Sequence, residues 1–306
     1  APRGDRPAWA LSAAPLALLG GASKGGLTAL VGTSWACVQD NLKRACAYAT
    51  MGEPGLMMLA CGIRGYGGGV FELFTQAWPK ALLFLAAGVV IRELRTEQMR
   101  EMGGLFRRMR FTGTLALIGL AAAAGLPPLS TFWGKDAILS RALAKGNPVW
   151  IVLVTLVIFL MALSLFRIFA LVFLGETARR RRFEPDRIRD ARGRVALAMV
   201  LLAIPSVLVG IRGFPRHSDF LGFVALRGVP LANSHFWAAA IVAVVSLLGA
   251  AVAWAIYVRR MLPAFAPGLE PARAAFRHGR YLARAHHVRV DRGLLPARRA
   301  PGRGGR

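Results

Sequence analysis

Three polar side chains recur at every fourth position of one apolar segment, a pattern that suits proton transfer. Glu72, Gln76 and Lys80 lie in "GVFELFTQAWPKALLFLAAGVVI", and this spacing places them along one face of a helix. A proton can be transferred along such a face between a carboxylate, an amide that orients water and an ammonium. Pro79 removes a backbone donor beside Lys80 and predicts a kink there. In the alternative interpretation, Glu72 and Lys80 lie near a membrane face or pair simply to hold helices together.

A second candidate site lies where another apolar helix is interrupted, in "AAAAGLPPLSTFWGKDAIL". Pro127 and Pro128 end its first half, and Lys135 and Asp136 precede its second half. Irregular backbone is tolerated at membrane depth only inside protein or beside water, and ion-coupled transporters contain such breaks. Burial disfavours a charged lysine whereas a nearby carboxylate favours it, so the pair predicts a group that takes up and releases protons. Alternatively, residues 112–125 form a short or re-entrant helix and Lys135 lies in an ordinary surface loop.

Three more charged residues fall inside apolar segments, where charge is costly and usually has a partner or a water-filled path. Arg167 is expected either to pair with Asp136 or Glu72, or to extend toward an arginine-rich membrane face about two turns away. Glu53 is predicted to lie within the membrane. Lys24, among four glycines, lies either in a channel or in a loop between two short apolar pieces.

The elements that position these residues are apolar runs long enough to cross a membrane. Of the 306 residues, 55% are hydrophobic, and the mean hydropathy is +0.47. Runs of about twenty apolar residues predict membrane-spanning helices. The sequence therefore predicts an all-α polytopic membrane protein of about seven transmembrane helices, one of them broken at Pro127–Pro128. The predicted spans are 12–38, 44–63, 68–92, 112–144, 148–175, 193–211 and 236–258.

The net charge of +25 would favour nucleic-acid binding in a soluble protein. Here the arginines lie between apolar runs, so the sequence argues against a nucleic-acid partner and for a lipid bilayer. Loops near 39–44, 92–111 and 176–194 hold about sixteen Lys and Arg, against about seven on the opposite side including the N-terminus. This asymmetry orients the protein with its C-terminal tail in the cytoplasm.

The chain divides into four predicted parts. A flank at 1–11 precedes a proton-conducting helix repeat at 12–176, which is followed by two additional transmembrane helices with loops at 177–258. A basic tail at 259–306, rich in Arg, Pro and Gly, is predicted to be disordered and to lie against anionic headgroups. The three cysteines show no CxxC spacing, so neither a disulfide framework nor a metal site is predicted.

Several stretches together resemble a known family. They are "QDNLKRACAYATMGEPGLMML", "FELFTQAWPKALLFLAAG", "MGGLFRRMRFTGTLALIGLAAAAGLPPLSTFWGKDAIL" and "SLFRIFALVFLGE". In the same order, they are similar to the second half of subunit 5, or subunit L, of NADH:quinone oxidoreductase (complex I), an antiporter-like membrane subunit. The strong part of this resemblance covers residues 14–176, and the remainder is looser.

The resemblance implies a proton-translocating subunit built from two inverted five-helix repeats, of which this chain resembles only the second. By this likeness Lys80 is the central lysine, Lys135 the lysine on the broken helix toward the exit side, and Asp136 its neighbouring carboxylate. Arg167 is the arginine of the following helix. NAD, FMN, iron–sulfur clusters and quinone are then expected on partner subunits, with no cofactor and no redox centre in this chain. Other membrane-arm subunits of the complex are the expected partners.

The sequence departs from the family pattern at two places on these helices. Glu72 and Gln76 stand where the family usually has two histidines, so a group that titrates near neutral pH is replaced. Gly52, Glu53, Pro54 and Gly55 stand where the family has a Ser-Gln-Leu-Gly run. The link between Lys80 and its inner partner is therefore expected to differ from the usual one.

The function predicted from the sequence is proton conduction through buried Lys and Glu residues in a redox-driven NADH:quinone oxidoreductase of the inner (plasma) membrane. The chain itself carries neither cysteine spacing for an iron–sulfur cluster nor a glycine fingerprint for a nucleotide. The alternatives are a subunit of a multisubunit cation/proton antiporter or related ion-coupled transporter, or a non-pumping fragment.

Overall fold

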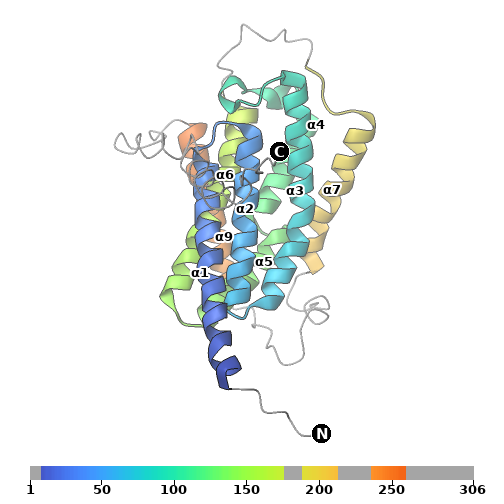
Figure 1. Cartoon of the computed structure of the whole chain (residues 1–306). Coiled ribbons are helices and arrows are strands. Elements are labelled where there is room, and N and C mark those ends of the chain that lie inside the picture. The colour runs from blue at the N-terminus through green and yellow to red at the C-terminus, as the bar shows by residue number, and fades with distance from the viewer. Residues whose placement is uncertain (1–7, 176–187, 213–235, 260–306) are drawn as a thin grey trace, which may run out of the picture. The chain divides into compact units, whose positions relative to one another are not determined.

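The described part of the chain is a bundle of α-helices that run up and down beside one another (Figure 1). The computed structural model describes residues 8–175, 188–212 and 236–259. Its helices are α1 (Ala8–Val38), α2 (Leu42–Gly62), α3 (Tyr66–Leu94), α4 (Arg110–Ala124), α5 (Ser130–Ala144), α6 (Pro148–Phe169), α7 (Gly193–Arg212) and α9 (Phe236–Tyr257). A π-helical turn, Ala170–Leu174, continues α6.

Each predicted span coincides with one helix or with a pair of helices, which confirms the all-α polytopic fold. The predicted span 112–144 contains both α4 and α5. Among the described residues, three helices are long and apolar enough to cross a membrane alone, namely α3, α6 with its π turn, and α9. Most of the predicted flank 1–11 and nearly all of the predicted tail 259–306 lie outside the described residues.

Helices α1 and α2 pack backbone to backbone because glycines line both sides of their contact. A Cβ atom added at Gly32 of α1 would lie 2.8 Å from the backbone nitrogen of Gly52. One added at Gly55 of α2 would lie 2.5 Å from the backbone nitrogen of Ala29. Small residues at such positions let helices approach closely in a membrane, where packing rather than exclusion of water holds helices together.

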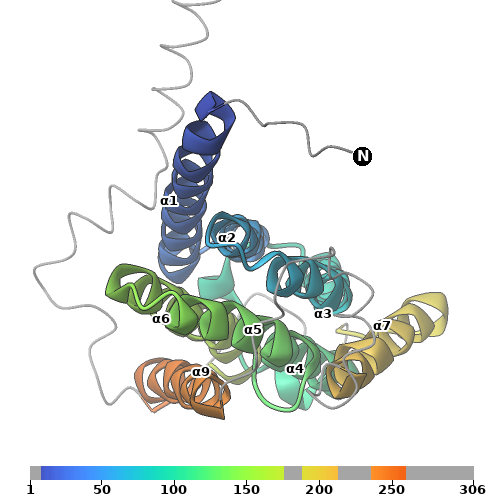
Figure 2. The same cartoon turned by 90° about the horizontal axis from the view of Figure 1, so that it is seen from below.

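The break between α4 and α5 follows from its local sequence. Helix α4 ends at Gly125, whose φ of 80° is the left-handed conformation that favours glycine. The Gly125 N–H donates to the Ala122 carbonyl, and the Leu126 N–H donates to the Ala121 carbonyl. The two prolines that follow lack N–H groups and cannot extend the helix. Helix α5 then starts afresh, contacts α3, α6, α7 and α9, and lies near the middle of the bundle (Figure 2).

The other end of α4 is capped by a residue distant in sequence. Its N-cap residue, Met109, makes no side-chain cap. Instead, Asp190 accepts hydrogen bonds from the Phe111 N–H at 2.8 Å, the Thr112 N–H at 3.0 Å and the Thr112 hydroxyl at 2.5 Å. These amides are otherwise unpaired at a helix start, so Asp190 ties the segment before α7 to the broken span.

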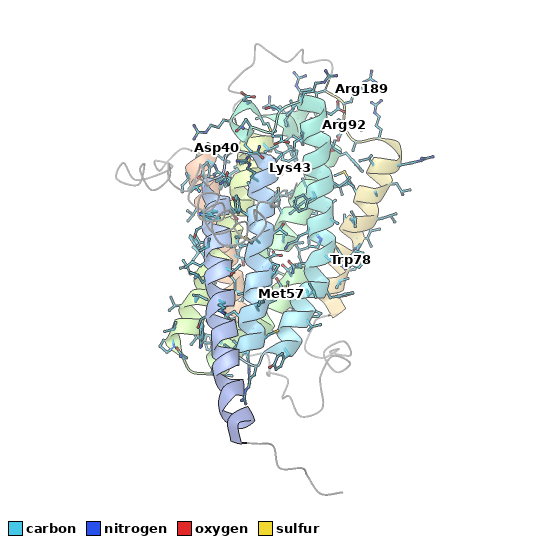
Figure 3. All side chains as sticks on the ribbon, in the orientation of Figure 1. Asp40, Lys43, Met57, Trp78, Arg92 and Arg189 are labelled. Carbon is cyan, nitrogen blue, oxygen red and sulfur yellow. The ribbon has the colours of Figure 1, made fainter. Side chains whose placement is uncertain are left out.

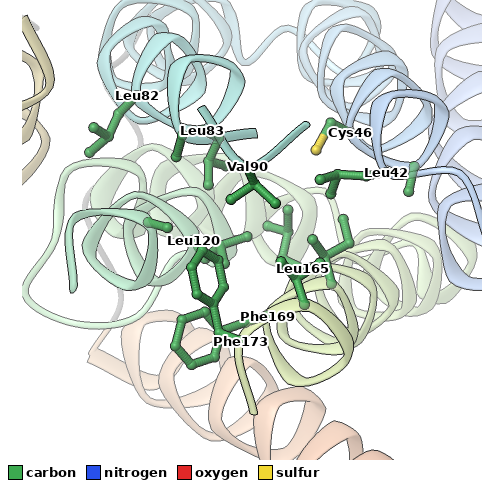
Figure 4. Packing of buried hydrophobic residues seen from close by; sticks show 14 of the residues in the cluster. Leu42, Cys46, Leu82, Leu83, Val90, Leu120, Leu165, Phe169 and Phe173 are labelled. Atoms are coloured by element: carbon green, nitrogen blue, oxygen red, sulfur yellow. The ribbon is translucent and has the colours of Figure 1, made fainter. Parts of the chain in front are cut away.

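Apolar clusters fill the bundle toward each of its two ends. In the cluster drawn in Figure 4, Val90 of α3, Leu120 of α4 and Leu165 and Phe169 of α6 meet between their helices. Helix α2 also supplies Cys46 and Ala49 to that cluster, and it supplies Leu56 and Leu59 to the second one. Glu53, one turn after Ala49, therefore lies where the apolar packing changes from one cluster to the other.

Candidate functional site

Two ion pairs join three helices in the membrane interior. Lys80 Nζ of α3 lies 2.5 Å from Glu53 Oε2 of α2, and Lys135 Nζ of α5 lies 3.5 Å from Glu72 Oε1 of α3. Helix α3 thus contributes the cation of one pair and the anion of the other. Eight residues at 1.5 Å each place its two members about 12 Å apart along the helix axis.

Lys135 and its partner Glu72 are both fully enclosed, with no exposed surface. The Lys135 ammonium donates to the Ala123 carbonyl at 2.6 Å and to the Thr131 hydroxyl at 3.0 Å, and Thr131 in turn donates to the Ala122 carbonyl. Ala122 and Ala123 belong to the last turn of α4, whose unpaired carbonyls form the negative end of the helix dipole. The cation therefore bridges the break in the membrane span.

Glycines make room for both members of this pair. A Cβ added at Gly125 would lie 2.8 Å from Lys135 Cδ. One added at Gly134 would collide with Glu72 Oε2 and lie 3.0 Å from Glu72 Cα. Glu72 is fully buried, and within the described residues no donor hydrogen-bonds to its Oε2. A buried carboxylate is costly without a counter-charge, and the Lys135 ammonium supplies one at 3.5 Å.

Gln76 and Asp136 lie in the same interior without joining either pair directly. Gln76 is buried, and its Nε2 donates to Met57 Sδ at 3.4 Å. Asp136 is buried beside Ser140, whose hydroxyl donates to Asp136 Oδ1 at 3.5 Å. Consecutive helical residues point in directions about 100° apart, so Asp136 does not face the partner of Lys135.

Arg167 lies away from these pairs and reaches Asp40. Asp40 lies toward the same end of the bundle as Lys43, Arg92 and Arg189 (Figure 3). The Arg167 guanidinium donates to the Gln39 carbonyl at 2.6 Å and to Asp40 Oδ1 at 3.2 Å. The expected pairing with Asp136 or Glu72 is therefore not the one observed. The alternative expectation, extension toward the arginine-rich face, agrees with this position, because Asp40 also pairs with Arg100 at 3.1 Å.

A small cavity adjoins the first ion pair. Thr50, Glu53 and Lys80 form one part of its lining. Ala123, whose carbonyl holds Lys135, lines it as well. The cavity thus borders the first ion pair and also the residue whose carbonyl binds the second lysine.

Sequence reasoning placed Glu53 inside the membrane but did not include it among the site residues, and it did not single out Asp40. The available signal for Glu53 was a carboxylate in mid-span beside a proline.

Lys24, by contrast, is exposed on α1. Its neighbour Gly25 lies against Met58 and Leu59, near the end of α2 and away from the pairs. Among the described residues, no group of three His, Cys, Asp or Glu side chains is arranged to hold a metal ion.

Membrane spans that bury lysine–carboxylate pairs beside a broken helix define an antiporter-like, ion-translocating class of membrane protein. Residues 22–164 match the family described as "NADH:quinone oxidoreductase/Mrp antiporter, TM", and through this region the chain belongs to that family.

Its relatives include NAD(P)H-quinone oxidoreductase subunit 5 from several sources. The chloroplastic protein of Mesostigma viride is 30% identical over 252 residues, which are 77% of this chain and 39% of the relative. The protein of Picosynechococcus sp. is 34% identical over 65% of this chain and 34% of the relative. The chloroplastic protein of Anthoceros angustus is 41% identical over 50% of this chain and 22% of the relative. The chain thus spans well under half the length of these relatives.

Proposed function

We propose that this chain conducts protons as a membrane-arm subunit of an NADH:quinone oxidoreductase. The observation that carries the proposal is the arrangement of Lys80–Glu53 and Lys135–Glu72, two ion pairs with buried carboxylates that share α3 and adjoin the broken span. The names of the relatives support the choice of complex. NAD, FMN, iron–sulfur clusters and quinone would then be bound by partner subunits, since none of the proposed roles of this chain requires them.

In this proposal a proton enters from the arginine-rich side, reaches Lys80, and leaves through Lys135 on the opposite side. Lys80 and Lys135 carry the proton, and Glu72 and Gln76 lie between them on α3. Asp136 lies next to Lys135 on the outlet side. Loss of a proton from either lysine leaves its carboxylate partner with an unpaired buried charge, which favours uptake of the next proton.

Arg167 has a supporting role in the proposed path. Its two hydrogen bonds fix α6 to the turn between α1 and α2 at the entry side. Residues 12–176 would form the conducting part, and 177–258 would add two helices. By the charge asymmetry of its loops, the protein would lie in the inner (plasma) membrane with its C-terminal tail in the cytoplasm.

A second candidate function is that of a subunit in a multisubunit cation/proton antiporter, because the matching family is described by both activities. The neighbouring genes discriminate between the two. Genes for flavin and iron–sulfur subunits support the oxidoreductase, whereas further antiporter subunits without them support the antiporter.

The test uses the intact complex reconstituted into proteoliposomes, with Lys135→Met and Lys80→Met as variants. Each is expected to retain NADH oxidation in detergent but to lose most proton translocation, since Met preserves length and removes the ammonium. Lys145→Met is the matched control, because Lys145 is exposed at the end of α5. Wild-type proton translocation in both variants would overturn the proposed path.

A further inference from the structure

Pro54 creates a vacant hydrogen-bond acceptor next to Glu53. Within an α-helix, the carbonyl of residue 50 accepts from the N–H of residue 54, and proline has no N–H. Lys80 occupies this acceptor, because its Nζ donates to the Thr50 carbonyl at 3.2 Å. The same ammonium lies 2.5 Å from Glu53 Oε2. Two residues of α2 less than one helical turn apart, Thr50 and Glu53, therefore supply a freed carbonyl and a carboxylate to one lysine.

We propose that Glu53, with the Thr50 carbonyl freed by Pro54, is the proton-accepting partner of Lys80. The proposal rests on the proposed function and adds Glu53 to the path as a residue that carries the proton itself. In the transfer, one Nζ–H bond of Lys80 breaks and a bond between that hydrogen and Glu53 Oε2 forms. An ammonium and a carboxylate become an amine and a carboxylic acid, and the net charge of the pair stays zero.

Burial makes this exchange feasible at this position. The Glu53 side chain is 2% exposed and that of Lys80 is 16% exposed. A weakly polar interior disfavours both charges, so burial reduces the free-energy difference between the ion pair and the neutral pair. The Thr50 carbonyl accepts a hydrogen bond from the ammonium and, more weakly, from the neutral amine, so Lys80 keeps a partner in both states.

The position of Glu53 also gives the proton somewhere to go. Glu53 lines the same cavity as Ala123, whose carbonyl accepts a hydrogen bond from Lys135. Lys80 and Glu72 lie on the same helix, so the pairs Lys80–Glu53 and Lys135–Glu72 are linked through α3. Among the other residues that line this cavity, the Cys46 thiol of α2 is the one further titratable group. Helices α4 and α6 contribute only the apolar Ala123 and Leu165 to the lining. Helix α1 faces this part of α2 with the uncharged Thr33 and Ala29.

The test compares Glu53→Gln, Glu53→Asp and Pro54→Ala in the reconstituted complex, with proton translocation followed against pH. Glu53→Gln removes the acceptor and leaves a buried ammonium without a counter-charge, which favours its neutral form. We expect roughly a tenfold loss of translocation and a pH profile displaced by about one unit or more toward lower pH. Glu53→Asp should restore a measurable part of the rate.

Pro54→Ala gives position 54 an N–H that reclaims the Thr50 carbonyl from Lys80. We expect the pH profile of this variant to move toward lower pH as well, by less than that of Glu53→Gln. Two matched controls remove a carboxylate or a helix-interior proline elsewhere. They are Glu93→Gln, whose carboxylate pairs with the exposed Arg92, and Pro205→Ala in α7. Neither should move the pH profile.

An unchanged rate and pH profile in Glu53→Gln, alongside lost translocation in Lys80→Met, would overturn this inference and leave the proposed function standing. Failure of both Glu53→Gln and Glu53→Asp to assemble into the complex would also overturn it, because the pair would then be structural. Unchanged translocation in Lys80→Met would instead overturn the proposed function itself. The assembled amount of each variant is measured by the content of the complex in the membrane.

Discussion

Gly134 of α5 and Glu72 of α3 touch so closely that the glycine hydrogen alone fits between the carboxylate and the α5 backbone. This contact explains why Glu72 reaches Lys135, one residue further along α5. A carboxylate on α3 at this position therefore depends on the absence of a side chain on the facing helix. The two residues act as one unit, although 61 other residues separate them in the sequence.

Gly134→Ala should impair proton translocation. The added methyl group displaces the Glu72 carboxylate from Lys135, and a misplacement of about 1 Å in a proton-transfer site lowers rates by roughly tenfold or more. Proton translocation in proteoliposomes measures the effect. Gly88→Ala in α3 is the control, because a Cβ there meets no atom within 4 Å. Equal rates for the two variants would contradict the importance of the contact.

Gly55→Val should destabilise the packing of α1 on α2. Its Cβ would meet the backbone of Ala29 at 2.5 Å and that of Gly25 at 2.8 Å, and backbone atoms cannot move aside as a flexible side chain does. Overpacking of this kind costs about 1–3 kcal/mol or more. The midpoint of thermal unfolding in detergent, read from helical circular dichroism, should fall. Gly20→Ala, at an open position of α1, should leave the midpoint unchanged or raise it.

Asp40→Asn should destabilise the protein more than the double substitution Asp40→Asn with Arg167→Gln. The single change leaves the Arg167 side chain, which is 3% exposed, as a buried cation without its carboxylate. Breaking a buried pair in this way costs about 3–5 kcal/mol, whereas removal of both charges is often much less harmful. A double-mutant cycle on unfolding midpoints measures the difference. Additive effects of the two substitutions would show that the pair is not coupled.

Asp190→Ala should weaken the start of α4 in a pH-dependent way. Burial by itself raises the pKa of the Asp190 carboxyl, but hydrogen bonds from Thr112, Phe111 and Ala191 outweigh it and lower the pKa below its usual value. A lowered folded-state pKa means that the stabilisation is complete above the unfolded pKa of about 3.9 and is lost as pH falls through the folded value.

At neutral pH the free energy of unfolding of the wild-type protein should therefore exceed that of Asp190→Ala by about 1 kcal/mol, the usual contribution of a helix cap. The difference should shrink as the pH falls below about 4. Unfolding midpoints across this range provide the measurement. Arg189→Ala is the control, since the Arg189 side chain is exposed and its hydrogen bond to Glu93 uses the backbone N–H. A difference independent of pH would show that the carboxylate is not the stabilising group.

The membrane spans could be predicted from the sequence because run length and hydropathy are local properties. The break was predictable for the same reason, since Gly125, Pro127 and Pro128 act on their own backbone. The partners of Lys80 and Lys135 were not predictable in this way. Glu72, Gln76 and Lys80 share a face of one helix, which suggested transfer along α3, yet their closest polar contacts are to α2 and α5.

Helix-to-helix pairing depends on the rotation and depth at which neighbours pack. Small residues such as Gly52, Gly55 and Gly134 set that packing, and their role becomes visible only once both helices are in place. Arg167 illustrates the same limit. Its position within an apolar run was evident, but its choice of Asp40 over Asp136 or Glu72 follows from the turn between α1 and α2, which lies more than a hundred residues earlier.

Lys80 is the central residue of α3, and this position has an electrical consequence. A transmembrane voltage does work of about 2.3 kcal/mol per 100 mV on each elementary charge that crosses the whole membrane. A proton that pauses at mid-span divides this work into two parts, each roughly half of the total. Because each lysine is matched by a carboxylate, the resting set carries no net charge, and the voltage acts chiefly on the proton in transit. Both halves of the transfer should therefore slow or quicken with the membrane potential to a similar degree.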